Sequence, residues 1–250
     1  MDIVVCIKRV PATDTAIKIA ADGKSFDSAG VKFELNAYDE FALEQALRTK
    51  EQLGAGTVTV VTLGPKDAQK ELRDALARGA DKAVLLVTDE WVNDSWSAAK
   101  ALVGWMKTQK CDLVFCGKQA VDADNSQLPP RLAAMLGFGC VTEVVKLSLE
   151  GSVFTAERDI EGAREVIECK TPAVISCNKG LNDPRYPNLK GIMAAKKKPL
   201  EEVPTRLEAP AMSVTALTLP PARAAGKILG NGADAVPALI DALRNEAKAL

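Results

Sequence analysis

Four short segments of the chain contain the residues best suited to bind a small molecule. They are residues 6–10, 36–39, 63–65 and 117–127. Each follows an apolar run typical of a strand or precedes a helical pattern, and the last two lie at predicted helix starts. Backbone N–H groups at a helix start have no partner within the helix and readily bind a phosphate. Gly64 and Gly117 have no side chain, so the backbone there can approach a ligand closely. The four segments together predict a site for a phosphate-bearing molecule.

Asp122 and Asp124 in the last segment restrict which phosphate-bearing molecule fits. Their carboxylates would repel a triphosphate, and they suit ribose hydroxyls or hydrogen bonds within a turn. Asn125, Ser126 and Gln127 are neutral donors at the helix entrance and fit a monophosphate. Neither GxxxxGKS/T nor GxGxxG occurs in the sequence, so it contains no P-loop and no usual dinucleotide fingerprint. A set of ordinary turns and helix caps remains the alternative interpretation of these residues.

The sequence contains no histidine. This removes the commonest general base, the commonest metal ligand and the usual Ser-His and Cys-His nucleophile pairs. Catalysis by lysine, tyrosine or a carboxylate stays open. The composition therefore favours binding or carrying over a hydrolase or a metalloenzyme, and no metal site is predicted.

Composition places the chain among ordinary globular proteins. Apolar residues make up 47%, charged residues 26%, and the formal net charge is −1, so no basic excess suggests nucleic-acid binding. No apolar run approaches the ~18–20 residues of a membrane span. Met1 and Asp2 lead directly into apolar residues without a secretory signal, and we expect a cytoplasmic protein. None of the six cysteines forms a CxxC pair; free thiols are the preferred interpretation over a disulfide framework.

Short apolar runs alternate with helical patterns over about the first 140 residues. We expect strands at residues 3–7, 57–63, 83–87 and 113–116. We expect helices at residues 39–50, from Pro65 to Gly79, from Asn93 or Asp94 to about residue 107, and from Pro129-Pro130 to just before Gly137. Buried strands separated by helices predict a doubly wound, mostly parallel, Rossmann-like α/β sheet. Ligands bind beyond the carboxyl ends of such strands, where the strand order reverses.

The pattern changes after residue 140. Residues 141–149, 153–158, 164–169 and 173–178 read as consecutive strands with short turns, which predicts an antiparallel extension of the sheet. Beyond Pro199, prolines and alanine-rich pieces predict an arm over residues 200–223 that runs across a partner. A terminal amphipathic helix over residues 234–250 has Val236, Leu239, Ile240 and Leu243 on one face. We therefore divide the chain into a nucleotide-binding domain (1–180), a partner-recognition loop (181–199) and a C-terminal arm with a helix (200–250).

Residues 180–199 combine a fixed backbone with exposed apolar and basic side chains. Pro184 and Pro187 restrict the backbone, and the sequence gives no convincing helical or strand period before Ala194. The segment suits contact with another protein. A surface loop followed by a solvated helix end is the alternative. The side chains predicted to dock a partner are Tyr186, Leu189, Ile192, Met193, Lys196, Lys197 and Lys198.

Several segments, in the expected order, resemble the β (small) subunit of electron-transfer flavoproteins. IVVCIKRV (residues 3–10) resembles its first strand, LNAYDEFALEQALRTKE (35–51) its first long helix, and GKQAVDADNSQ (117–127) its nucleotide-binding loop. AERDIEGAREVIECKTPAVIS (156–176) resembles its signature region, with Ala163 where an acidic residue or glycine is usual. GLNDPRYPNLKGIMAAKKKP (180–199) resembles its recognition loop. The resemblance covers residues 1 to about 200.

The resemblance implies a subunit of an αβ heterodimer that carries electrons. Such carriers accept electrons from acyl-CoA dehydrogenases and related flavoenzymes of fatty acid oxidation and pass them to a respiratory-chain acceptor, here a membrane quinone oxidoreductase. FAD would be held mainly by the α subunit, and this chain would bind AMP structurally and contain no catalytic residue. In the electron-bifurcating type a second FAD replaces AMP, and that alternative stays open. A stand-alone adenine-nucleotide-binding stress-type module, which would form a homodimer, is a further alternative.

The resemblance also assigns residues. Nucleotide contacts would carry over to Cys6, Asn36, Ala37, Tyr38, Asp39, Leu63, Gly117, Gln119, Ala120, Val121, Asp122, Asp124, Asn125, Ser126, Gln127 and Leu128. Leu128 departs from the threonine common in the family, and Pro129-Pro130 replace small and polar residues. Leu189 resembles the anchor that inserts into a partner pocket. Lys196, Lys197 and Lys198 resemble the adjacent basic tract that would attract acidic partners.

Overall fold

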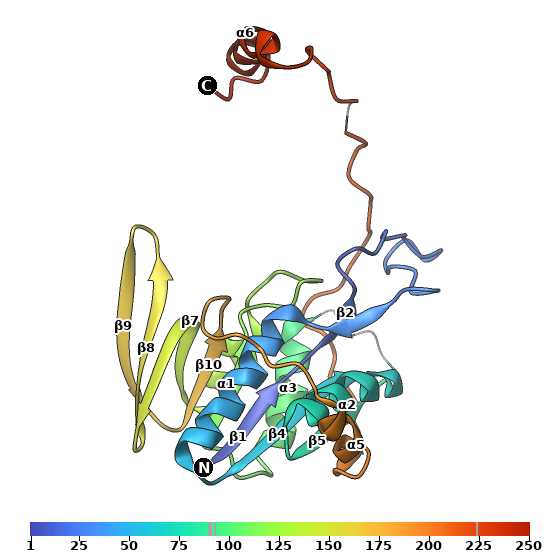
Figure 1. Cartoon of the computed structure of the whole chain (residues 1–250). Coiled ribbons are helices and arrows are strands. Elements are labelled where there is room, and N and C mark those ends of the chain that lie inside the picture. The colour runs from blue at the N-terminus through green and yellow to red at the C-terminus, as the bar shows by residue number, and fades with distance from the viewer. Residues whose placement is uncertain (90–91, 93, 224) are drawn as a thin grey trace.

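A nine-stranded sheet forms the centre of the molecule in the computed structural model (Figure 1). The structure describes residues 1–89, 92, 94–223 and 225–250. Its strand order is β11-β5-β4-β1-β6-β10-β7-β8-β9. The strands are β1 (Asp2–Cys6), β4 (Thr57–Gly64), β5 (Lys82–Val87), β6 (Leu113–Gly117), β7 (Gly139–Glu150), β8 (Val153–Ile160), β9 (Ala163–Lys170), β10 (Ala173–Cys177) and β11 (Leu200–Pro204). A separate antiparallel pair joins β2 (Arg9–Pro11) and β3 (Phe33–Leu35).

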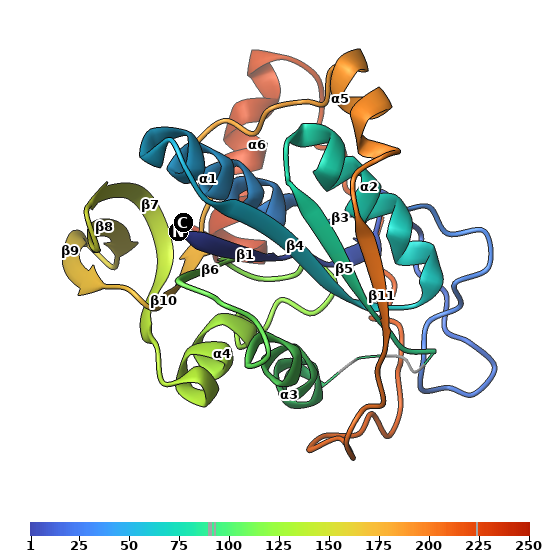
Figure 2. The same cartoon turned by 90° about the horizontal axis from the view of Figure 1, so that it is seen from below.

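Helices cover both faces of the sheet (Figure 2). On one face lie α1 (Ala37–Leu53) and α2 (Gln69–Arg78), which follows a short 3-10 turn (Lys66–Ala68); on the other lie α3 (Ser95–Met106) and α4 (Leu128–Leu136). The alternation of side chains along β1 explains this layering. Ile3 and Val5 pack in the core with α1 and α2, whereas Val4 and Cys6 pack with α3 and α4. The predicted doubly wound, Rossmann-like α/β fold is confirmed.

The predicted helix ends are confirmed at several positions. Pro65 precedes the turn that leads into α2, and Gly79 ends α2. Asp94 caps α3 by accepting hydrogen bonds from the backbone N–H groups of Trp96 and Ser97. Gly137 ends α4 with a left-handed φ of 71°. Asn93, the other predicted cap of α3, lies outside the described residues.

The antiparallel extension is smaller than predicted. Strands β7, β8 and β9 pair antiparallel in sequence order. Strand β10 instead inserts between β6 and β7 and runs parallel to both. The prediction of four consecutive antiparallel strands was therefore wrong for residues 173–177. The five residues of β10 are all buried, and burial on both faces is typical of a central parallel strand.

The segment after Pro199 begins inside the sheet rather than as a free arm. Residues 200–204 form β11, which pairs parallel with β5 at the edge. The extended segment follows, and Figure 1 shows it leaving the domain toward the terminal helical region, which contains a 3-10 turn (Ala233–Ala235), α6 (Val236–Asp241) and a π-helical turn (Ala242–Glu246). Val236, Leu239 and Ile240 are exposed there.

Two further observations concern the whole described chain. Within the described residues no helix is both long and apolar enough to cross a membrane. All six cysteines are free thiols, as predicted.

Candidate nucleotide site and docking segment

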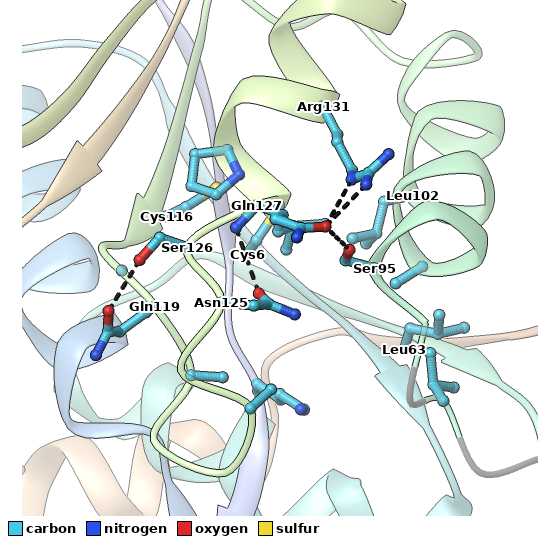
Figure 3. Close-up of a pocket in the computed structure, with 18 of the residues that line it drawn as sticks. Cys6, Leu63, Ser95, Leu102, Cys116, Gln119, Asn125, Ser126, Gln127 and Arg131 are labelled. Carbon is cyan, nitrogen blue, oxygen red and sulfur yellow. Dashed lines mark hydrogen bonds between the residues drawn. The ribbon is translucent and has the colours of Figure 1, made fainter. Parts of the chain in front are cut away.

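A large cavity lies where the strand order reverses. The chain passes from β1 to β4 on one side and later adds β6 on the other side of β1. A cavity of about 670 Å³ opens beyond the carboxyl ends of these three strands. This volume is typical of small-molecule sites. Its apolar lining includes Cys6, Val61, Leu63 and Leu102, some of which Figure 3 shows.

Asp39, in the first turn of α1, connects two of the strand ends at the cavity. Its carboxylate accepts hydrogen bonds from the backbone N–H of Lys8, at 2.7 Å, and of Gly117, at 3.1 Å. Burial raises the pKa of Asp39 to about 7, although hydrogen bonds from Asn36, Lys8 and Gly117 act in the opposite direction. A Cβ at residue 117 would stand 2.3 Å from Asp39 Oδ1 and 2.7 Å from the carbonyl carbon of Tyr38. Glycine at position 117 thus permits α1 to approach β6.

Asn36 binds the loop that follows β6 without lining the cavity itself. Its side chain is fully buried. Nδ2 donates to the carbonyl oxygen of Gln119 at 2.9 Å, and Oδ1 accepts from the N–H of Val121 at 3.1 Å. Asn36 therefore shapes the loop rather than lining the cavity.

The loop over residues 118–127 has an unusual backbone. Asp124 and Ser126 adopt positive φ values of 50° and 52°, a region that non-glycine residues seldom occupy and that clusters at ligand sites. Ser126 Oγ donates to Gln119 Oε1 at 2.8 Å, and Gln119 Nε2 donates to Asp124. These side-chain bonds hold the strained loop in place.

Gln127 lies at the centre of a polar cluster at the start of α4 (Figure 3). Its Oε1 accepts a hydrogen bond from Ser95 Oγ at 2.8 Å. Arg131 points toward the same oxygen and donates from Nη2 at 2.8 Å and from Nε at 3.3 Å. Asn125 Oδ1 accepts from the backbone N–H of Gln127 at 3.3 Å.

The carboxylates Asp94 and Asp122 of the cavity wall have partners within the protein. Lys8 Nζ donates to both oxygens of Asp122, at 2.8 and 2.7 Å. Asp94 caps α3 and also accepts from the N–H of Ala211 at 2.9 Å. Burial raises the pKa of Asp94, but the hydrogen bonds outweigh burial and hold the pKa below its usual value. Through Ala211 and Met212 the C-terminal arm forms part of the cavity wall.

The structure brings together many of the predicted site residues. Those that line the cavity are Cys6, Asp39, Leu63, Gly117, Gln119, Ala120, Asp122, Asn125, Ser126, Gln127 and Leu128. Five others lie outside the lining: Asn36, Ala37, Tyr38, Val121 and Asp124. They belong to the start of α1 and to the strained loop.

Sequence reasoning missed several lining residues. Lys8 lies in the segment after β1 that we expected at the site, and Ser95 directly follows the predicted cap of α3. The sequence position of each residue was therefore a signal that could have identified it. Arg131 lies about one turn inside α4, and a cationic residue so near a helix start was the available signal. Met212 also lines the cavity. The sequence around it does not predict this, because no local pattern indicates that the arm passes the cavity.

The second candidate surface is an exposed apolar patch, the docking patch, formed by Tyr186, Leu189, Ile192 and Met193. Tyr186 is 87% exposed and Leu189 78%. Residues 189–195 form a short helix, α5 (Leu189–Ala195), which the sequence pattern did not predict. Asn188 caps it by accepting from the N–H of Gly191 at 2.7 Å. Leu189 thus stands at the first position of a capped helix.

Salt bridges fix the residues before the docking patch to α1. Arg185 donates to Glu44 at 2.8 Å and to Glu51 at 2.6 Å. Burial raises the pKa of Glu44, but hydrogen bonds from Arg185 and Arg48 outweigh it and hold the pKa below its usual range. Asn182 Nδ2 donates to the carbonyl oxygen of Phe41 at 3.0 Å. The docking patch is therefore presented on a fixed support.

The three lysines of the predicted basic tract differ in their surroundings. Lys196 and Lys197 are exposed. Lys198 turns inward, and its Nζ donates to the carbonyl oxygens of Leu76 and Ala80 at the end of α2, at 3.0 and 2.6 Å. Burial lowers the pKa of Lys198. Its contacts support the attachment of α5 to α2.

Comparison with known proteins identifies the family. A family model described as "Electron transfer flavoprotein domain" matches residues 24–208. "Electron transfer flavoprotein subunit beta" of Bacillus subtilis (strain 168) is 40% identical over 260 residues, covering 100% of both chains. The protein of the same name from Thermoanaerobacterium thermosaccharolyticum is 38% identical, with 98% of each chain covered. "Electron transfer flavoprotein subunit beta, mitochondrial" of Oryza sativa subsp. japonica is 37% identical, with 100% of each covered. The chain therefore belongs to the electron transfer flavoprotein family, among its β subunits.

Proposed function

We propose that this β subunit binds AMP in the cavity beyond β1, β4 and β6, where the nucleotide has a structural role. The observation that carries the proposal is the chemistry of the cavity wall. The wall contains the polar residues Asn125, Ser126 and Gln127 and the apolar side chains of Leu63 and Leu102. Polar donors suit a phosphate, and apolar side chains suit a planar base. The carboxylates Asp94 and Asp122 already have partners in the protein, which limits repulsion of an anion.

The redox chemistry belongs to FAD, which the α subunit holds for the most part. FAD supplies the reversible uptake of electrons when bound, and the chain itself contributes binding and orientation. The assembled carrier accepts electrons from acyl-CoA dehydrogenases or related flavoenzymes and passes them to a respiratory-chain acceptor, a membrane quinone oxidoreductase. No residue of this subunit acts as a catalyst in this proposal.

The docking patch recognises the dehydrogenases. Leu189 is 78% exposed, and Tyr186 and Met193, which flank it in the sequence, are also exposed, so Leu189 can enter an apolar pocket of a partner. Burying one leucine contributes about 1.5–3 kcal/mol. An anchor of that size suits a transient complex. The exposed Lys196 and Lys197 attract acidic partners before contact.

The α subunit covers the C-terminal arm and helix. Leu219 and Ile228 in the arm are 60% and 88% exposed, and Val236, Leu239 and Ile240 are exposed in the terminal helix. A row of exposed apolar side chains on an extended segment favours a permanent partner over free solvent. These exposed side chains argue against a stand-alone nucleotide-binding module, because such a module would have no partner to cover them.

The experiment that tests this proposal measures the nucleotides of the complex co-expressed with its α subunit, by denaturation and chromatography. One FAD and one AMP for each heterodimer support the proposal. Two FAD molecules without AMP would assign the second flavin to this cavity and place the protein in the electron-bifurcating type. A homodimer that retains no flavin-binding subunit would support the stand-alone module.

A further inference from the structure

Three donors converge on one oxygen at the start of α4. Gln127 Oε1 accepts from Ser95 Oγ and from two nitrogens of Arg131, as the dashed lines of Figure 3 show. An amide oxygen has two lone pairs. The three donors therefore offer more hydrogen-bonding capacity than this neutral acceptor can use. A phosphate oxygen, which is charged, would be a stronger acceptor in the same place.

The helix start itself offers a phosphate fewer donors than usual. Pro129 and Pro130 occupy the first turn of α4, and proline carries no backbone N–H. The backbone N–H of Arg131 already donates to the carbonyl oxygen of Gln127 at 3.2 Å. Recognition of an anion at this end of the cavity must therefore depend more on side chains than in an ordinary helix N-terminus.

Arg131 differs from the other cations of the cavity wall. Lys8 pairs with Asp122 at 2.7 Å, and Lys118 pairs with Glu143 at 2.9 Å. Arg131 forms no salt bridge with any carboxylate among the residues that the structure describes, and its guanidinium lies 5.6 Å from the centre of the Trp96 ring. Its charge is thus left available to a ligand, and the ring restricts where the guanidinium can lie.

We propose that Arg131 is the residue that recognises the phosphate of the nucleotide, and that Ser95 Oγ donates a second, uncharged hydrogen bond to it. When the nucleotide binds, the phosphate takes the place of Gln127 Oε1, and the amide side chain of Gln127 moves aside. The guanidinium supplies the charge-assisted hydrogen bonds that two prolines have removed from the helix start. This inference rests on the proposed function and adds which residue selects a phosphorylated nucleoside over an unphosphorylated one.

The test compares AMP with adenosine, because the two differ by the phosphate alone. Binding of each to the nucleotide-depleted αβ heterodimer is measured by titration calorimetry for the wild type, Arg131→Gln, Arg131→Lys and Lys8→Gln. Arg164→Gln, which changes an exposed arginine on β9, is the matched control and should alter neither affinity. We expect Arg131→Gln to lower the affinity for AMP roughly 10- to 100-fold, the range for charged hydrogen bonds, and to leave adenosine within about twofold.

Each result has a definite meaning. Arg131→Lys should lose less AMP affinity than Arg131→Gln, since it keeps the charge without the planar pair of donors, and it provides the comparison if Arg131→Gln does not assemble. Unchanged AMP binding in Arg131→Gln, or an equal loss for AMP and adenosine, would overturn the inference while the AMP site stands. Selective loss of AMP binding in Lys8→Gln would assign the phosphate to Lys8 instead of Arg131 and would also overturn the inference. Failure of the wild type to bind either molecule would overturn the AMP proposal and this inference together.

Discussion

Gly117 and Asp39 approach each other so closely that the end of β6 and the start of α1 leave no room for a side chain at residue 117. A Cβ added to Gly117 would lie 2.3 Å from Asp39 Oδ1, and the same carboxylate accepts the N–H of Gly117 at 3.1 Å. The conflict also involves backbone atoms of Tyr38 and Asp39. The position of the loop after β6, and with it the shape of the cavity, therefore depends on the absence of a side chain at residue 117.

Gly117→Ala is expected to displace α1 from β6. Overpacking of this kind costs about 1–3 kcal/mol of stability or more, and nucleotide content should fall with it. Gly104→Ala is the matched control, because a Cβ there meets nothing within 4 Å and alanine favours the helix by about 0.5–1 kcal/mol. Thermal unfolding and bound nucleotide of both variants test the prediction. A Gly117→Ala protein as stable and as fully loaded as Gly104→Ala would contradict it.

Asp39 should make stability depend on pH between about 4 and 7. Burial raises its pKa from 3.8 to about 7 in the folded protein, so the folded state binds more protons than the unfolded state in this window. The contribution of Asp39 to the free energy of unfolding is fully present below about pH 4 and is lost as pH rises to 7. The free energy of unfolding changes by at most about 1.4 kcal/mol for each pH unit. Melting temperatures of wild type and Asp39→Asn across this range measure the effect. Parallel curves for the two proteins would refute it.

Leu189→Ala is expected to weaken docking of the dehydrogenases without lowering flavin content. Loss of a buried leucine anchor removes up to about 1.5–3 kcal/mol, which corresponds to roughly a 10- to 100-fold weaker complex. Steady-state kinetics with a dehydrogenase as the varied partner should show a higher KM. Val166→Ala is the control, since Val166 is an exposed apolar side chain on β9, away from the docking patch. Parallel losses of electron transfer and flavin would refute the prediction.

Arg185→Gln should loosen the support of the docking patch. It leaves the buried Glu44 with Arg48 as its remaining partner among the salt bridges of the described residues, and we expect a loss of about 1–3 kcal/mol. The variant should also raise the KM for dehydrogenases, because Leu189 follows this segment directly. Arg164→Gln removes surface salt bridges and should cost well under 1 kcal/mol. Equal effects of the two substitutions on stability would show that the Glu44 pair contributes no more than a surface pair.

Local patterns predicted the parallel core and its helix ends because they depend on nearby residues. The apolar runs of β1 and β4, Gly79 after α2 and Asp94 before α3 act within one element. The insertion of β10 between β6 and β7 could not be predicted in this way. A strand buried on both faces looks the same wherever it enters a sheet, and its neighbours are separated from it by long stretches of chain.

The candidate site shows the same division. Residues of the loop after β6 were found because glycine, carboxylates and amides follow one another there. Arg131 and Met212 reach the cavity through the direction of a helix and the return of the arm, which no short motif encodes. Lys198 was grouped with its two neighbours, but the nearby end of α2 turns it inward.

Both free edges of the nine-stranded sheet are protected against further strand pairing. At one edge β9 exposes Arg164, Glu168 and Lys170, and at the other β11 exposes Glu201 and Glu202 and ends at Pro204. Charged side chains and proline on edge strands discourage aggregation through the backbone. The molecule can therefore expose apolar side chains at Leu189 and along its arm, for specific partners, without its sheet serving as a template for fibre growth.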